Sequence, residues 1–334
     1  MRRRDFIKGI VGSAATWPLA VSAQQPVIPV IGFLHLGTAD AYSNNALAVF
    51  RRGLQETGFV EGQNVTIEYR YADNKYDRLP ELAADLVRRR VAIIVEVSGG
   101  SATALAAKAA TSTIPIVVAF GSDPVKLGLA ASLNRPGGNV TGSTFFTTEL
   151  VSKRLELLCE LVPQARTIGY LRTGPQLSTV VHEQMEADAL ASARSLSRQL
   201  LIVKVDKAEE LEGAFSTLTA EHADALLIAS APFFDIVEVT DQLAAMTLKN
   251  KLPAIYQYRA FAAAGGLMSF GADQREAFRQ AGIYTGRILK GEKPADLPFQ
   301  QSTKVELTIN LKTARALGLS VPQSLRVAAD EVIE

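Results

Sequence analysis

Two short corners rich in glycine, serine and aspartate carry side chains that could bind a small polar molecule. The first corner consists of Ser98, Gly99, Gly100 and Ser101, and the second of Gly121, Ser122 and Asp123. Each corner directly follows an apolar run, at residues 93–97 and 116–120. In parallel sheets, small ligands bind beyond the carboxyl ends of the strands, where N–H groups at helix N-termini attract anions. These residue types therefore predict non-covalent binding of a small anion.

Both corners also have a purely structural explanation. Glycine and serine are common turn residues after a strand. Asp123 followed by Pro124 is typical of a cap at the start of a helix. The two explanations stay open for each corner taken alone, and two corners on adjacent strands of one sheet favour a binding site.

The rest of the chain supplies elements that could hold these corners in place. Apolar runs bounded by turn residues are typical of buried strands, and they alternate here with segments of helical periodicity. The expected strands cover residues 30–34, 65–71, 93–97, 116–120, 167–171, 200–205, 225–229, 254–256, 265–271 and 304–310. The expected helices cover residues 43–57, 78–90, 153–161, 179–199, 209–221, 235–250, 274–290 and 312–317. Strands recur about every 25 to 35 residues, the period of βαβ units, which predicts an α/β fold.

The 334 residues are too many for one small domain and fit two lobes of ordinary size. Three non-helical passages, residues 142–147, 265–273 and 297–304, could carry the chain between the lobes. We therefore predict two doubly wound parallel-sheet lobes joined by a hinge of three crossings. Lobe 1 is expected to comprise residues 24–143 and 272–298, and lobe 2 residues 144–271 and 299–334.

The N-terminus has the pattern of an export signal. Arg3 and Arg4 are followed by Asp-Phe-Ile-Lys, as in twin-arginine leaders, and a mildly apolar segment then ends in Val-Ser-Ala at residue 23. We predict a signal peptide over residues 1–23, cleavage after Ala23 and a periplasmic protein. A retained membrane anchor is the alternative, although the segment is short for a membrane span.

Composition excludes several classes of function. Removing the predicted leader takes four basic residues and one acidic residue from the formal charge of +1 and leaves about −2, which argues against nucleic-acid binding. Cys159 is the only cysteine, so neither an intramolecular disulfide nor a cysteine metal cluster is expected. His35, His182 and His222 are too scattered for a metal site, and no catalytic or nucleotide-binding motif occurs. We therefore expect no enzymatic activity, no metal and no cofactor.

Several motifs give the chain a family resemblance. They lie at residues 114–118, 123–125, 133–142, 153–158 and 288–291, and the run Asn-Arg-Pro-Gly-Gly-Asn-Val-Thr-Gly at 134–142 is a specific marker. With these motifs the mature chain resembles the solute-binding proteins of ABC importers with the type I periplasmic-binding fold. It is similar in particular to the subfamily related to tryptophan and tyrosine uptake proteins. The resemblance implies a monomer that closes on one small solute between its lobes and then docks on a membrane permease.

The resemblance also implies that the two walls of the cleft bind different parts of the ligand. In related amino acid receptors, loops of the first lobe hold the ligand carboxylate, which would assign this role to the two corners. Leu36 and Thr38, in the loop after the first strand, would lie beside them. The candidates for the opposite wall are the strand exits of lobe 2, namely Arg172, Thr173, Pro232, Phe233, Tyr256, Tyr258, Gly271 and Asp273.

Some of these opposite-wall candidates have competing explanations. Tyr256 and Tyr258 could stack on a planar ligand and donate from their hydroxyl groups, or could be half-buried packing rings. Asp273 could contact the ligand or cap the helix expected to start at residue 274. Arg172 could receive an acidic or carboxylated solute through a bidentate contact.

The function expected from the sequence is capture of a small solute, and the expected ligand is an amino acid or a related carboxylate. Two alternatives of the same fold stay open. The chain could present its closed form to a membrane signalling receptor, or it could bind a sugar-type ligand. Both alternatives use the same hinge closure, because a ligand favours the state that binds it better.

Overall fold

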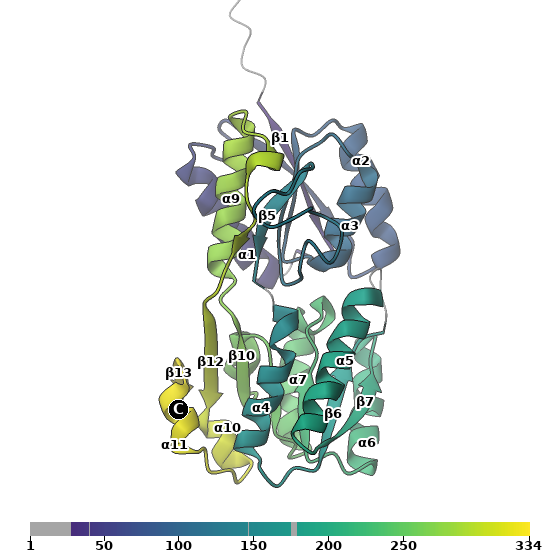
Figure 1. The fold of residues 1–334 in the computed structure, drawn as a ribbon, viewed down its shortest axis with the longest axis vertical. Helices are drawn as coiled ribbons and strands as arrows, with labels where there is room; N and C mark the ends of the chain where they lie inside the picture. Colours follow the sequence, from purple (N-terminus) through teal and green to yellow (C-terminus); the bar gives the residue numbers. More distant parts are fainter. Residues whose placement is uncertain (1–27, 40, 146, 175–178) are drawn as a thin grey trace, which may run out of the picture.

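Buried strands alternate with helices along the part of the chain that the computed structural model describes, which is residues 28–39, 41–145, 147–174 and 179–334. The strands form two separate sheets, and each sheet with its helices makes one lobe (Figure 1). The predicted leader, residues 1–23, lies outside the described residues.

The first sheet has the strand order β11-β5-β4-β3-β1-β2, with parallel pairs throughout. Its strands are β1 (Val30–His35), β2 (Thr66–Tyr71), β3 (Ile93–Val97), β4 (Ile116–Phe120), β5 (Val140–Thr144) and β11 (Gln300–Gln301). One face is covered by α1 (Ala41–Glu56) and α9 (Arg275–Leu289), the other by α2 (Leu79–Arg88) and α3 (Gly100–Ala110) (Figure 1). Burial on both faces explains why β4 is a continuous apolar run and why β3 is apolar except for Glu96.

The second sheet has the order β13-β12-β10-β9-β8-β6-β7. Its strands are β6 (Thr167–Arg172), β7 (Gln199–Lys204), β8 (Ala225–Ile228), β9 (Ala254–Tyr256), β10 (Met268–Ala272), β12 (Val305–Asn310) and β13 (Glu331–Ile333). The sheet is parallel as predicted except at one pair, since β10 and β12 are antiparallel. The reason is that β10 leads into the first lobe and β12 returns from it.

The remaining helical elements are mostly connections of the second lobe. Its helices are α4 (Val151–Leu161), α5 (Thr179–Ser195), α6 (Leu211–Ala220), α7 (Val237–Lys249), α8 (Arg259–Ala263), α10 (Leu311–Ala316) and α11 (Gln323–Ala328). Short 3₁₀ turns are η1 (Tyr76–Arg78), η2 (Thr147–Leu150), η3 (Ala208–Glu210), η4 (Pro232–Asp235) and η5 (Pro294–Asp296).

The chain passes between the two sheets after β5, after β10 and after β11. Strand pairing places these passages one to three residues from the predicted boundaries, because β5 ends at 144, β10 at 272 and β11 at 301. Gln300–Gln301 therefore belongs to the first sheet, although it was expected in lobe 2. Two passages are joined by hydrogen bonds, since Asp273 N donates to Lys304 O at 3.0 Å and Ser302 Oγ to Asp273 O at 3.2 Å.

Helices α1 and α9 pack unusually closely behind the second passage. A Cβ atom on Gly53 would lie 1.9 Å from Arg279 O, and one on Gly282 would lie 2.1 Å from Phe50 O. Real Cβ atoms do not approach backbone oxygens this closely, so both positions need glycine. The ion pair between Arg279 and Glu56, at 2.7 Å, joins the same two helices.

Two helical expectations differ from the structure. The helix start that the structural explanation of Asp123 and Pro124 implies does not form, since residues 124–128 make turns that end at Gly128 with φ of +69°. The helix expected over 179–199 ends at Ser195. There the chain reverses through Ser197 at φ +55° and closes with a hydrogen bond of 2.8 Å from Arg198 N to Ala193 O. Side-chain periodicity alone does not reveal such left-handed stops when the residue is not glycine.

Candidate ligand-binding site

A hollow of about 790 Å³ lies between the lobes. Lobe 1 contributes side chains of α1, such as Ala46 and Val49, and lobe 2 contributes Gln257, Tyr258 and Gly271 at the exits of β9 and β10. Asp273, in the second passage, also lines it. Three of the predicted opposite-wall residues are thus lining residues of one interlobe hollow.

The first corner meets the second lobe directly. A Cβ atom on Gly100 would lie 2.9 Å from Pro232 Cγ, so the start of α3 and the turn η4 are in contact across the gap. Gly121, in the second corner, lies against Phe145 and Thr147, where the chain leaves the first sheet. The structure therefore brings one predicted residue of each wall together and places the second corner beside the first passage between the sheets.

Ser98 adopts the left-handed conformation, with φ of +61°, and turns its hydroxyl toward His35. Gly37 N donates to His35 Nδ1 at 3.0 Å, which leaves the ring proton on Nε2. His35 Nε2 lies 3.2 Å from Ser98 Oγ, so the imidazole donates to this oxygen. The hydroxyl proton of Ser98 can then be donated to another acceptor.

Glu96, inside β3, was not singled out by the sequence analysis. Its carboxyl is fully buried and Oε1 accepts a hydrogen bond of 2.5 Å from Gly99 N, directly beneath the first corner. Burial raises the pKa of Glu96 to about 8, against the lowering effect of backbone N–H donors. Within the described residues Oε2 has no hydrogen-bond partner. A charged residue in an otherwise apolar strand was the signal that could have identified it.

Arg154, in the first turn of α4, is the second residue that was missed as a site residue. Its side chain is fully buried, and Nη2 donates to Ser230 Oγ at 2.9 Å. Nε and Nη1 have no partner in the described part of the chain. Burial lowers the pKa of Arg154 to about 10, which keeps the guanidinium charged at neutral pH. An arginine on the apolar face of a helix, between Val151 and Leu158, was the available signal.

The two predicted tyrosines have different surroundings. Tyr256 is 1% exposed, packs against Phe234 and Phe261, and its hydroxyl donates to Asp235 Oδ1 at 2.5 Å. Burial raises the pKa of Asp235 to about 7, although Tyr256 and Gln257 donate to it. Tyr256 is thus a packing ring of the second core, whereas the half-buried Tyr258 lines the interlobe hollow.

Three charged candidates already have partners in the protein. Arg172 forms an ion pair of 2.7 Å with Glu186 on α5 and donates to Thr173 O. Asp273 accepts a hydrogen bond of 3.0 Å from Arg275 N at the start of α9, as a helix cap does. Asp123 accepts one of 2.8 Å from Val125 N and caps a turn instead of a helix.

The other predicted residues differ in their exposure and packing. Leu36 is buried behind Gly99, and Thr38 is half-buried. Ser122 is buried and its carbonyl accepts from Thr144 Oγ1 at 2.8 Å. Ser101 and Phe233 are half-buried. Gly271 packs so closely against Gln257 O, at 2.0 Å from a hypothetical Cβ, that its main role is strand packing.

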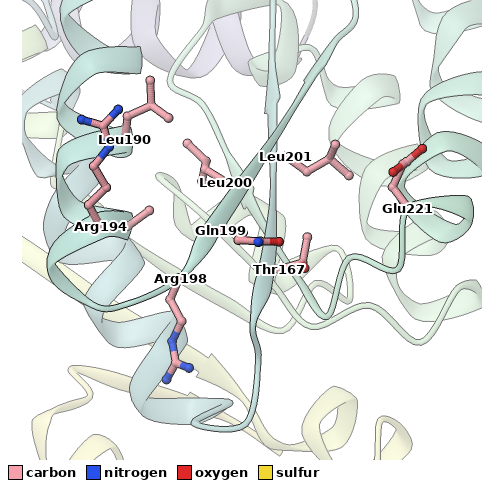
Figure 2. Close-up of a pocket in the computed structure, with 9 residues that line it drawn as sticks. Thr167, Leu190, Arg194, Arg198, Gln199, Leu200, Leu201 and Glu221 are labelled. Atoms are coloured by element: carbon pink, nitrogen blue, oxygen red, sulfur yellow. The ribbon is translucent and has the colours of Figure 1, made fainter.

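Another hollow, of about 410 Å³, lies on the edge of the second sheet (Figure 2). Thr167 and Gln199, the first residues of β6 and β7, line it together with Arg194, Arg198 and Glu221. Because ligands of such sheets bind beyond the carboxyl ends of the strands, a hollow at the amino ends is not the interlobe site.

The described residues contain no group of three or more His, Cys, Asp or Glu side chains that could hold a metal ion. Among the helices that the structure describes, none has the length and apolar character needed to cross a membrane.

Comparison with known proteins identifies the family. The sequence model of the family "ABC transporter substrate binding protein" matches residues 40–333. A tyrosine-binding protein of Clostridioides difficile strain R20291 is 27% identical over 290 residues, which is 85% of this chain and 78% of that protein.

Solved structures agree on the fold. The ABC domain from Streptococcus pneumonia in complex with L-Trp has a TM-score of 0.80 at 24% identity, over 91% of this chain and 99% of that one. The ligand-free, open structure of a substrate binding protein from Clostridium difficile has a TM-score of 0.63 at 24% identity, over 92% and 99%. Likeness to periplasmic binding proteins confirms the predicted class of two α/β lobes with the type I periplasmic-binding fold. The chain belongs to the family of ABC transporter substrate-binding proteins, which bind small solutes, interact with a permease and are not enzymes.

Proposed function

We propose that the chain is the periplasmic solute-binding component of an ABC importer, and that it captures an amino acid or a related carboxylate between its lobes. The observation that carries this proposal is a set of buried polar atoms without hydrogen-bond partners among the described residues. They include Glu96 Oε2, Thr147 Oγ1, Arg154 Nε and Nη1, and Gln257 Oε1. Buried polar atoms are nearly always paired in folded proteins, so these groups fit a polar solute that completes their hydrogen bonds.

Aromatic amino acids are the ligands that the comparisons favour. One relative is named a tyrosine-binding protein, and one similar structure holds L-Trp. Tyr258 beside the interlobe hollow supplies a half-buried ring that could stack on such a side chain. Polar groups at fixed positions would then select the amino and carboxylate groups.

Hinge closure is part of the proposal. The chain superimposes better on the L-Trp complex than on the ligand-free open structure, at equal identity and similar coverage. The contact between Gly100 and Pro232 across the gap supports the same arrangement. We infer that the solute favours this closed form and that the permease recognises it.

Export through the twin-arginine leader, cleavage after Ala23 and a monomeric state complete the proposed function. The charge of about −2 without the leader fits a soluble receptor that meets its permease at the membrane surface.

A thermal-shift screen of the protein without its leader tests the ligand class. The screen should include L-tyrosine, L-tryptophan, other amino acids, aromatic acids and sugars. A ligand at 100 times its Kd stabilises the protein by about 2.7 kcal/mol. We expect L-tyrosine or L-tryptophan to raise the melting temperature clearly, while a rise with sugars alone would contradict the proposed ligand.

A further inference from the structure

The guanidinium of Arg154 is fully buried in lobe 2. Helix α4 packs on β8 and β9, and Arg154 lies in its first turn. Among the described residues its hydrogen-bond partner is Ser230, two residues beyond the end of β8. Electrostatic neighbours include Tyr258, two residues beyond the end of β9, which also lines the interlobe hollow. The charge therefore lies close to Tyr258, which lines the interlobe hollow, and to Ser230, which follows the carboxyl end of β8.

The part of the chain that the structure describes supplies no counter-charge for Arg154. Within the described residues no Asp or Glu forms an ion pair with Arg154, and its electrostatic neighbours are the phenols of Tyr170, Tyr256 and Tyr258. Arg172, another arginine at a strand exit, differs because Glu186 pairs with it at 2.7 Å. A buried charge without a partner destabilises a protein strongly. Because the buried charge of Arg154 destabilises the fold, its presence indicates a role in binding.

The hydrogen-bond inventory of Arg154 points the same way. A guanidinium has five N–H donors, and the bond to Ser230 Oγ uses one of them. Ser230 is half-buried, and because its oxygen accepts from Arg154, its own proton can be donated to another acceptor. Guanidinium and hydroxyl groups together match a carboxylate, which accepts several charge-assisted hydrogen bonds.

We propose that Arg154 and Ser230 form the carboxylate receptor of this binding site, so that the anionic end of the solute points into lobe 2. This inference rests on the proposed function, because it concerns the same interlobe solute. It reverses the orientation that the two corners of lobe 1 suggested from the sequence. The amino group of an amino acid would then face lobe 1, where Glu96 is buried beneath the first corner.

A comparison of two ligands and three proteins tests the proposal. L-tryptophan and tryptamine differ only in the carboxylate, and their Kd values are measured by calorimetry for the wild type, Arg154→Met and Arg172→Met. Loss of one partner of a buried charge pair should weaken L-tryptophan binding to Arg154→Met at least about 30-fold. Tryptamine should bind this variant and the wild type equally, and Arg172→Met should leave both ligands unaffected.

Melting temperatures separate binding from folding. Met has a similar length and no charge, so Arg154→Met should melt, without added solute, at or above the temperature of the wild type. Three results would overturn the proposal: unchanged L-tryptophan affinity in Arg154→Met, equal losses for both ligands, or a lower melting temperature that accompanies the weaker binding. A wild type that binds neither L-tryptophan nor L-tyrosine contradicts the proposed function itself, and this inference falls with it.

Discussion

Adding a methyl group at Gly100 should disturb the closed arrangement of the lobes more than it disturbs the folding of the protein. Its Cβ would lie 2.9 Å from Pro232 Cγ of the other lobe, whereas carbon atoms pack at about 3.5 to 4.0 Å. The proline ring is tied to the backbone of η4 and cannot swing aside as a long side chain would. Gly100→Ala therefore requires the lobes to separate by roughly 0.6 to 1 Å at this point, or η4 to move.

Two costs of Gly100→Ala can be separated with a matched control. Its φ of +79° is left-handed, where alanine costs about 1 to 2 kcal/mol of folding free energy whatever the position of the lobes. The clash raises the free energy of the closed form alone, by about 1 to 3 kcal/mol, as in other overpacked sites. Gly62 has the same φ of +79° and no atom within 4 Å of a hypothetical Cβ, so Gly62→Ala carries only the first cost.

Melting curves and L-tryptophan calorimetry measure both effects. We expect the two variants to lose similar melting temperature without added ligand. Only Gly100→Ala should bind more weakly, by roughly 5- to 150-fold, the factor that corresponds to its clash. Equal affinities of the two variants would refute the contact between α3 and η4 in the ligand-bound form.

Two further predictions concern a buried carboxyl and a helix contact. Because the pKa of Glu96 is raised from 4.5 to about 8, its protonated form contributes stability that is complete below about pH 4.5 and lost as the pH rises to about 8. Glu96→Gln should reduce the fall in melting temperature over this pH range. Part of the fall should remain, because the raised pKa of Asp235 has the same effect. An unchanged dependence of the melting temperature on pH would contradict the burial of protonated Glu96. In the contact between α1 and α9, Gly282→Ala should lower the free energy of unfolding by about 1 to 3 kcal/mol in urea. Gly213→Ala on α6, with no atom within 4 Å, should raise it by about 0.5 to 1 kcal/mol, and equal effects would disprove the close packing.

Much of the fold was predictable because its strands are buried on both faces. The apolar runs 93–97 and 116–120 coincide with β3 and β4, and the turn residues beside them end the strands where expected. Errors occur where backbone geometry decides without a glycine or proline signal, as at Ser197. The short pairing of β11 with β5 also escaped, since two exposed glutamines carry no periodic pattern.

The site was harder to predict because its chemistry depends on partners distant in sequence. Arg172 looked available for an anion, and its partner Glu186 lies on a helix that periodicity cannot orient. Arg154 and Glu96 are charged residues within apolar patterns of the sequence, and only the fold shows that each is fully buried. Tyr256 and Tyr258 share a strand exit in sequence, but only the second lines the interlobe hollow.

The hydrogen bonds between the second and third passages make a two-stranded ribbon of the hinge. A ribbon of paired backbone bends across its plane far more readily than it shears or twists, because shear breaks its hydrogen bonds. In the proposed closure, the lobes should therefore move along one path and reach one final relative orientation, whatever ligand they enclose. A permease that recognises this orientation needs no contact with the ligand itself.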